Sequence, residues 1–166
     1  MPRPQGRRIH ARPPGFSLVE LAVALAVLSG LLYFLFDRVL TMQEMSEKTE
    51  VEETVRTIDY ALRLEAASRL TRGAVPNQAP LERENPVKWL QTPPRNYLGE
   101  MAKPPAHARP AYWYFDPGER QLVYRPNRSD NLRVEGSKVK ELRFIVRIEG
   151  DALDPRLISR FSYAWF

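Results

Sequence analysis

The stretch Gly15-Phe16-Ser17-Leu18-Val19-Glu20 opens the segment that decides how this chain is organised. It begins a run over 16–36 that is apolar except for two serines and Glu20. A helix of about 20 apolar residues spans the hydrocarbon core of a membrane, so we predict a membrane-spanning helix over 16–36. A charged group near the centre of a bilayer costs about 2.5–3.5 kcal/mol, and the carboxylate of Glu20 therefore indicates a function.

The residues on either side of the apolar run predict its orientation. Four arginines and no acidic residue precede Gly15. Positive residues stay in the cytoplasm, so the N-terminus is expected there and everything after Phe36 on the far side of the membrane. An ordinary secretory signal has a shorter apolar stretch that ends in small residues. Here Asp37 and Arg38 follow the run, which argues against such a signal.

The basic leader, Gly15, Phe16, Glu20 and the long apolar helix together resemble the type III signal of type IV pilins and type II secretion pseudopilins. The resemblance covers about the first quarter of the chain. It implies that a prepilin peptidase removes the leader 1–15 between Gly15 and Phe16, and that Phe16 is then N-methylated. It also implies that Glu20 faces the amino group of a neighbouring subunit's first residue, so that two charges neutralise each other in an apolar surrounding.

Small residues recur at every fourth position within the apolar run. Ala22, Ala26 and Gly30 would form a ridge along one helix face, where another helix can approach closely. The alternative is that they reflect only the usual composition of membrane helices. We expect these three residues, with Glu20, to take part in assembly.

The helical pattern continues beyond the apolar run, because 37–72 contain no proline and no glycine. One apolar stripe follows helical spacing and predicts an amphipathic half that packs on a sheet. Its residues are Val51, Val55, Ile58, Leu62 and Ala66. Gly73 is a stop signal, and a helix over 16–72 would be about 85 Å long. The almost wholly polar 43–50 is expected to stand between the membrane and the domain.

The region 73–166 is expected to be a globular domain outside the membrane. We predict an extended proline-rich loop over 73–110, with one short helical turn near 87–90 and with Trp89 and Leu90 against the core. Strand-like segments follow at 111–115, 121–125, 142–148 and 158–166, and the first two form a hairpin around Asp116-Pro117-Gly118-Glu119. The expected fold class is α+β, a long N-terminal helix on an antiparallel sheet of three to four strands, which is also the pilin order.

Composition offers little for catalysis or for nucleic-acid binding. The chain has no cysteine and two histidines, one of them in the leader, so we expect no enzyme and no cofactor. Asp116, Asp130, Asp151 and Asp154 lie in expected turns, and their spacing fits turn formation better than a calcium loop, so no metal site is predicted. The formal charge of +5 falls to +1 without the leader, because 21 basic residues remain against 20 acidic ones. Nucleic acid is therefore an unlikely partner.

Three functional hypotheses remain. The first is a structural subunit of a type II secretion pseudopilus or a type IV pilus-like filament, with the prepilin peptidase, other subunits and an inner-membrane assembly platform as partners. It would cross a bacterial inner membrane once, with its N-terminus cytoplasmic and its domain periplasmic. The second is a minor pilin that binds DNA or a surface at a filament tip. The third is an unprocessed single-pass protein that uses the helix as an anchor.

Overall fold

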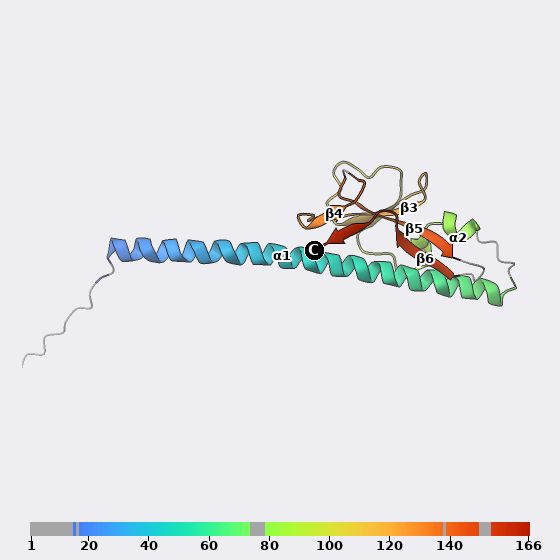
Figure 1. Cartoon of the computed structure of the whole chain (residues 1–166), viewed down its shortest axis with the longest axis horizontal. Helices are drawn as coiled ribbons and strands as arrows, with labels where there is room; N and C mark the ends of the chain where they lie inside the picture. The colour runs from blue at the N-terminus through green and yellow to red at the C-terminus, as the bar shows by residue number, and fades with distance from the viewer. Residues whose placement is uncertain (1–14, 16, 74–78, 138, 150–153) are drawn as a thin grey trace, which may run out of the picture. The chain divides into compact units, whose positions relative to one another are not determined.

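A computed structural model describes residues 15, 17–73, 79–137, 139–149 and 154–166. The chain divides into two compact units, the first ending at Thr41 and the second running from Met42 to Phe166. One helix, α1 (Leu18–Thr71), contributes to both units (Figure 1). Most of the expected leader and Phe16 lie outside the described residues.

Local sequence signals mark both the start and the end of α1. Ser17 precedes the first turn, and its Oγ accepts a hydrogen bond from the backbone N–H of Val19 at 3.2 Å, as an N-cap residue does. At the other end Gly73 adopts a φ of 73°, and its N–H donates to the carbonyl of Leu70 at 3.0 Å. A left-handed glycine just past the last helical residue is a common way to end a helix. The predicted stop at Gly73 is confirmed.

The other elements are short and belong to the second unit. They are α2 (Ala79–Arg83), the 3-10 helix η1 (Pro86–Trp89), β1 (Tyr97–Glu100), β2 (Tyr112–Asp116), β3 (Gln121–Arg125), β4 (Leu132–Val134), β5 (Leu142–Glu149), β6 (Asp154–Ser159) and β7 (Tyr163–Trp165). Five strands form one sheet in the order β1-β2-β3-β5-β6, and β4 pairs with β7 in a second sheet. β1 is parallel to β2, while the other pairs are antiparallel.

The predicted α+β class is confirmed, with more strands than expected. β1 lies within 73–110, where we expected a loop with a single turn. It is only four residues long, and its sequence Tyr-Leu-Gly-Glu does not alternate between apolar and polar residues, although exposure alternates along the strand. The strand expected over 158–166 is two strands in different sheets, because the chain turns after Ser159, whose Oγ donates to the carbonyl of Phe161 at 2.7 Å.

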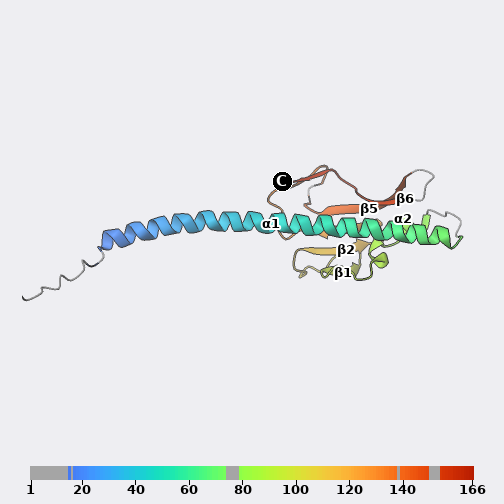
Figure 2. The same cartoon turned by 90° about the horizontal axis from the view of Figure 1, so that it is seen from below.

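The apolar stripe of α1 forms the core with one face of the large sheet. Val51, Ile58, Leu62 and Ala66 are buried, as predicted. Within the second unit α1 runs along the sheet, with β1 and β2 on one side of it and β5 and β6 on the other (Figure 2). The sheet residues in this core are Trp113, Phe115, Leu122, Tyr124, Leu142, Phe144, Val146 and Leu157.

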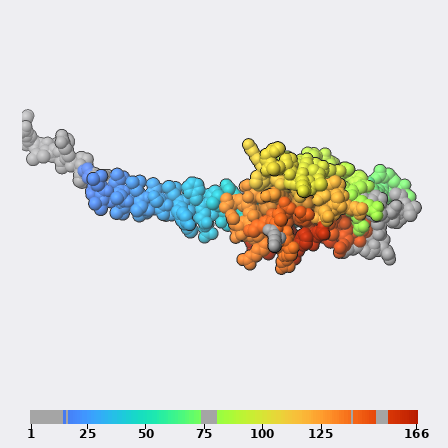
Figure 3. Space-filling model, turned by 90° about the horizontal axis from the view of Figure 1, so that it is seen from above, coloured from blue at the N-terminus to red at the C-terminus, as the bar shows by residue number. Residues whose placement is uncertain are grey.

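The predicted hairpin is confirmed between β2 and β3. Asp116 Oδ1 accepts hydrogen bonds from the N–H groups of Gly118 at 2.9 Å and Glu119 at 3.2 Å, which closes the turn. On the face of the sheet away from α1, Met101 and Ala108 pack against a small cluster of Tyr112, Tyr114 and Val123. The chain around these two residues, yellow in the space-filling view, lies at the surface of this unit (Figure 3).

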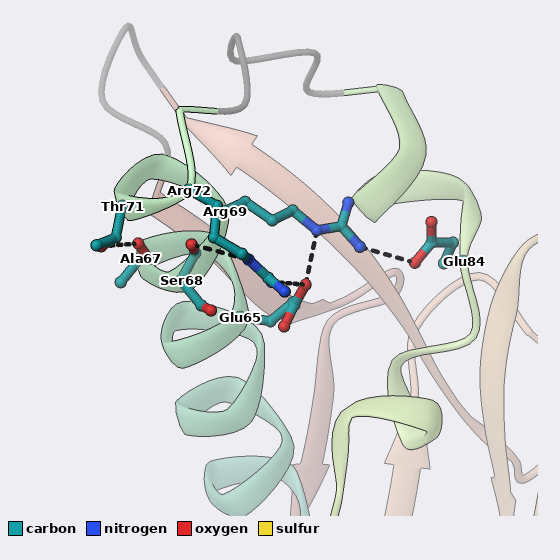
Figure 4. A network of polar contacts seen from close by, with 7 residues as sticks. All are labelled: Glu65, Ala67, Ser68, Arg69, Thr71, Arg72 and Glu84. Atoms are coloured by element: carbon teal, nitrogen blue, oxygen red, sulfur yellow. Dashed lines mark hydrogen bonds and ion pairs between the residues drawn. The ribbon is translucent and has the colours of Figure 1, made fainter.

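Ion pairs hold the end of α1 to the segment that follows α2. Arg69 Nε lies 2.8 Å from Glu65 Oε1, and Arg69 Nη2 lies 3.3 Å from Glu84 Oε2 (Figure 4). Hydrogen bonding to Glu65 raises the pKa of Arg69. The Arg69 guanidinium also lies 4.9 Å from the ring centre of Trp89, a cation–π distance. Trp89 and Leu90 pack against the core, as predicted.

Candidate functional site

The first half of α1 is an apolar helix that the chain itself does not cover. Every described residue from Ser17 to Leu40 is exposed, and Leu18 and Phe36 are 85% and 66% exposed. Such a surface is unfavourable in water, since burying apolar area contributes roughly 25 cal/mol per Å². α1 is long and apolar enough to be a membrane anchor.

Glu20 lies in the first turn of this helix, near its end rather than its centre. An acidic side chain in the first turn interacts favourably with the helix dipole, by about 0.3–1 kcal/mol. Ser17 and Glu20 also have the spacing of a capping box, S-x-x-E. Ser17 caps the helix through the N–H of Val19 rather than that of Glu20, and no hydrogen bond of the Glu20 side chain occurs among the described residues. Glu20 therefore has a local role in addition to the one that the resemblance implies.

The other predicted assembly residues lie along α1 without internal contacts. Ala22, Ala26 and Gly30 are exposed, and an added Cβ at Gly30 would meet no atom within 4 Å. The same holds for Gly15, whose φ is also not in the left-handed region. Neither space nor backbone conformation in the described chain requires glycine at position 15.

The polar stretch 43–50 is part of the domain, so our expectation that it stands apart is wrong for its two core-facing glutamates. Glu44 is 1% exposed. One of its oxygens accepts from the Asn131 N–H and from Trp165 Nε1, both at 3.0 Å, and the other accepts from Asn131 Nδ2 at 2.9 Å. The spacing of seven residues between Glu44 and Val51 places both side chains on the core-facing side of α1, but it does not indicate the partners of Glu44.

Glu47 makes a similar set of contacts one turn further along α1. Its Oε1 accepts from the Tyr124 hydroxyl at 2.8 Å and from the Asn127 N–H at 2.6 Å, and its Oε2 accepts from the Arg128 N–H at 3.2 Å. Burial, followed by this hydrogen bond to Glu47, raises the pKa of Tyr124. We call Glu44 and Glu47, with these bonds, the carboxylate clamp. It attaches α1 to the loop 126–131 and to β7.

A second polar cluster lies between η1 and β1, and sequence reasoning did not find it. Asn85 is buried, and its Nδ2 donates to the Tyr97 hydroxyl at 2.6 Å and to Glu100 Oε1 at 3.0 Å. Lys88 Nζ lies 2.9 Å from the same Glu100 oxygen. The hydrogen bond from Asn85, and then the one from Lys88, lowers the pKa of Glu100. These groups satisfy one another and hold η1 to the sheet.

The remaining candidates for chemistry are scattered. His107 is exposed, and Asp116 closes its turn. Asp130 pairs with Arg128 at 2.9 Å, and Asp154 pairs with Arg156 at 3.1 Å. Asp151 lies outside the described residues. Among the described residues no three metal-ligating side chains come together.

Comparison of the chain with protein-family models, curated proteins and solved structures found no match. What the protein does is therefore inferred from its own residues and geometry. Those residues form an exposed apolar helix and a domain into which the same helix continues.

Proposed function

We propose that this chain is a pseudopilin or minor pilin-like structural subunit of a type II secretion pseudopilus or a type IV pilus-like filament. It would be made as a precursor in the inner membrane, with its leader in the cytoplasm and its domain in the periplasm. The prepilin peptidase would cleave it after Gly15, and it would then assemble with other subunits through α1. An inner-membrane platform would drive that assembly.

The observation that carries the proposal is the position of the motif Gly15 to Glu20. It stands immediately before an uncovered apolar helix, and the same helix continues into an α+β domain. Nothing within the described chain requires a glycine at position 15, which favours recognition by another protein. Recognition of Gly15 by a peptidase would explain the glycine at this position. Packing against neighbouring subunits would explain why the chain itself leaves the apolar helix uncovered.

Processing tests the proposal directly. Co-expression with a prepilin peptidase should remove the 15-residue leader and leave Phe16 as the first residue, which N-terminal sequencing and mass spectrometry of the membrane fraction would detect. Gly15→Asp should block cleavage, because a charged side chain would occupy a site that accepts a hydrogen atom.

Gly6→Asp is the matched control, since it makes the same change within the leader and should be cleaved normally. An intact Met1 in the membrane form, with active peptidase present, would refute the proposal and favour the unprocessed anchor.

A further inference from the structure

The face of β5 and β6 that points away from α1 pairs like residues across the two strands. Core residues alternate with outward ones along β5, because successive side chains of a strand lie on opposite faces. On the outward face Ile145 lies opposite Ile158, and Arg147 lies opposite Arg156. Like charges directly opposite each other destabilise a sheet, so the Arg147–Arg156 pair is unfavourable in the isolated chain.

A second pair of arginines lies on the other side of the isoleucines. The backbone N–H of Arg160 donates to the carbonyl of Arg143 at 2.8 Å, which places the two residues opposite each other just past the end of β6. One pair of isoleucines therefore lies between two pairs of arginines. We call this set the arginine face. Its residues are Arg143, Ile145, Arg147, Arg156, Ile158 and Arg160.

Carboxylates of the domain neutralise only part of the charge of the arginine face. Arg147 is exposed and makes no ion pair with any side chain that the structure describes. Arg143 also donates to Gln121 at 3.3 Å, and Arg160 lies 5.5 Å from the ring centre of Phe161, but both of these partners are neutral. Only three carboxylates pair with arginines here, and two of them are shared between two arginines. The ion pairs are Arg143–Glu141, Arg125–Glu141, Arg156–Asp154, Arg63–Asp154 and Arg160–Glu119.

The isoleucine pair at the centre is not covered by an apolar cluster. Ile145 and Ile158 are each partly exposed, and neither belongs to the two apolar clusters of the described chain. The chain around Met101 and Ala108 packs on the same side of the sheet, but against β2 and β3. The outward face of β5 and β6 thus has an apolar centre between two positive rows.

We propose that the arginine face binds an acidic segment of a partner protein. Carboxylates of that segment pair with the arginines, and an apolar side chain between them covers Ile145 and Ile158. The two arginine pairs are separated by about 13 Å along β5, at 3.3 Å per residue. Carboxylates seven or eight residues apart on one face of a helix are about 10–12 Å apart, with room for an apolar residue midway. This inference goes beyond the proposed function and does not rest on it.

Nucleic acid fits this face less well than an acidic protein segment. The phosphates of a strand follow one another about every 3.4 Å along the helix axis, so a continuous row of charge would lie against the isoleucines. Single strands are held by aromatic side chains that stack on the bases. The aromatic residues on the outward face of the sheet, Tyr112 and Tyr114, are buried.

A peptide of the stated chemistry tests the proposal. The probe is a fluorescent helical peptide of about 12 residues, with two glutamates near each end and one leucine at the centre. Fluorescence anisotropy would measure its binding to the full chain in non-ionic detergent micelles. Arg147→Glu/Arg156→Glu should weaken binding by about tenfold or more. A peptide with serine in place of the leucine should bind the original chain about threefold more weakly.

The matched control is Arg56→Glu/Arg133→Glu, which makes the same change of charge at two exposed arginines elsewhere in the domain. It should change the affinity by less than about twofold, because neither residue lies on the arginine face. The four arginines before Gly15 are present in every variant, so any binding to them is constant.

Charge reversal also separates binding from folding. The variant Arg147→Glu/Arg156→Glu should bind a peptide in which lysines replace the glutamates, whereas the original chain should not. Arg147→Glu alone places opposite charges across the two strands, and it should raise the urea midpoint by roughly 0.1–0.5 M. The same single variant should bind the glutamate peptide more weakly, so stability and affinity should change in opposite directions.

Several results would overturn the proposal. Absence of binding to the original chain, or an equal loss in the control variant, would mean that the arginine face is not the site. A lower urea midpoint in Arg147→Glu would mean that the arginines stabilise the sheet instead. Equal binding of the leucine and serine peptides would remove the role of the isoleucines. Tighter binding of a DNA oligonucleotide of the same charge would identify nucleic acid as the partner.

Discussion

Glutamate has three different environments along α1, and each sets a different role for the same side chain. Glu20 is exposed in the first turn of the helix. Glu44 is buried and accepts three hydrogen bonds. Glu53 is exposed and pairs with Arg56 at 3.2 Å, a surface contact of the kind that contributes about 0.3–0.5 kcal/mol.

Glu20→Gln should separate processing from assembly. If the carboxylate pairs with the amino group of Phe16 in an adjoining subunit, the amide leaves that amine without its counter-charge, and breaking a buried pair from one side costs about 3–5 kcal/mol. The variant should accumulate as a cleaved monomer in the membrane. Crosslinking and sheared-filament fractions from cells with the full assembly machinery would measure this.

The control for Glu20→Gln is Glu53→Gln, which changes an exposed glutamate on the same helix and should assemble normally. Glu20→Val should also be cleaved and remain unassembled. Its gain in membrane insertion should be smaller than the 2.5–3.5 kcal/mol of a central charge, because Glu20 lies in the first turn. Normal incorporation of Glu20→Gln into filaments would exclude the charge-pairing mechanism.

Tyr124 should make the domain sensitive to alkali. Burial raises its pKa above the ordinary value of 10.0. The unfolded chain therefore loses this proton near pH 10, while the folded chain keeps it. The free energy of unfolding should be independent of this group below pH 10 and should fall above it, by up to about 1.4 kcal/mol per pH unit. Urea denaturation between about pH 8 and 11 would measure the slope.

Tyr124→Phe should reduce this slope without abolishing it, since burial also raises the pKa of Tyr97, Tyr114 and Tyr163. At neutral pH it should cost about 1 kcal/mol, because the hydrogen bond to Glu47 is lost. Tyr60→Phe is the control at a tyrosine that is 69% exposed. An unchanged alkaline slope in Tyr124→Phe would contradict the prediction.

At the scale of elements, α1 combines two patterns in one helix. Its first half is apolar all round, which suits an apolar surrounding such as lipid. Its second half has a single apolar stripe, which the sheet covers. Leu62 lies on that stripe and is 0% exposed, whereas Leu64, two residues on, is 60% exposed.

This pair of leucines tests the packing of the stripe. Leu62→Ala should lower the free energy of unfolding of the domain by about 2–5 kcal/mol, the usual cost of such a cavity. Leu64→Ala should change it by less than about 0.5 kcal/mol, because the side chain is exposed. Chemical denaturation followed by near-ultraviolet circular dichroism would measure both. Equal effects of the two substitutions would place the packing face of α1 elsewhere.

Some strands of the domain can be predicted from their local sequence, and others cannot. The β2–β3 hairpin was predictable, because Asp116, Pro117 and Gly118 each favour the turn that forms. β1 was not predictable from the sequence, because Tyr97–Glu100 lies among prolines and its extended form depends on pairing with β2. The division between β6 and β7 also depends on partners, as one strand pairs with β5 and the other with β4.

At the scale of the whole molecule, the second unit contains a core of its own. Its stripe on α1, its two sheets and the carboxylate clamp all lie within Met42–Phe166. Deleting residues 1–41 should therefore give a folded, monomeric, water-soluble α+β domain. Circular dichroism and size-exclusion chromatography would test this, with the full chain in detergent as the control. An unfolded or obligately oligomeric product would mean that the stripe is covered by other subunits.

The sequence by itself determined the features that depend on neighbouring residues. Apolar composition predicts a helix long enough to be a membrane anchor, periodicity predicts the stripe from Val51 to Ala66, and Gly73 predicts the end of α1. Such features can be predicted from local composition and periodicity, because the residues that produce them are close together in the sequence.

Only the tertiary structure decided the features that depend on distant partners. Glu44 and Trp165 are 121 positions apart in the chain, and their hydrogen bond makes a polar stretch part of the domain. Nothing in the composition of 43–50 indicates that contact, because the attraction of a carboxylate to an N–H group depends on distance in space. The parallel pairing of β1 and the split of the last strand have the same cause.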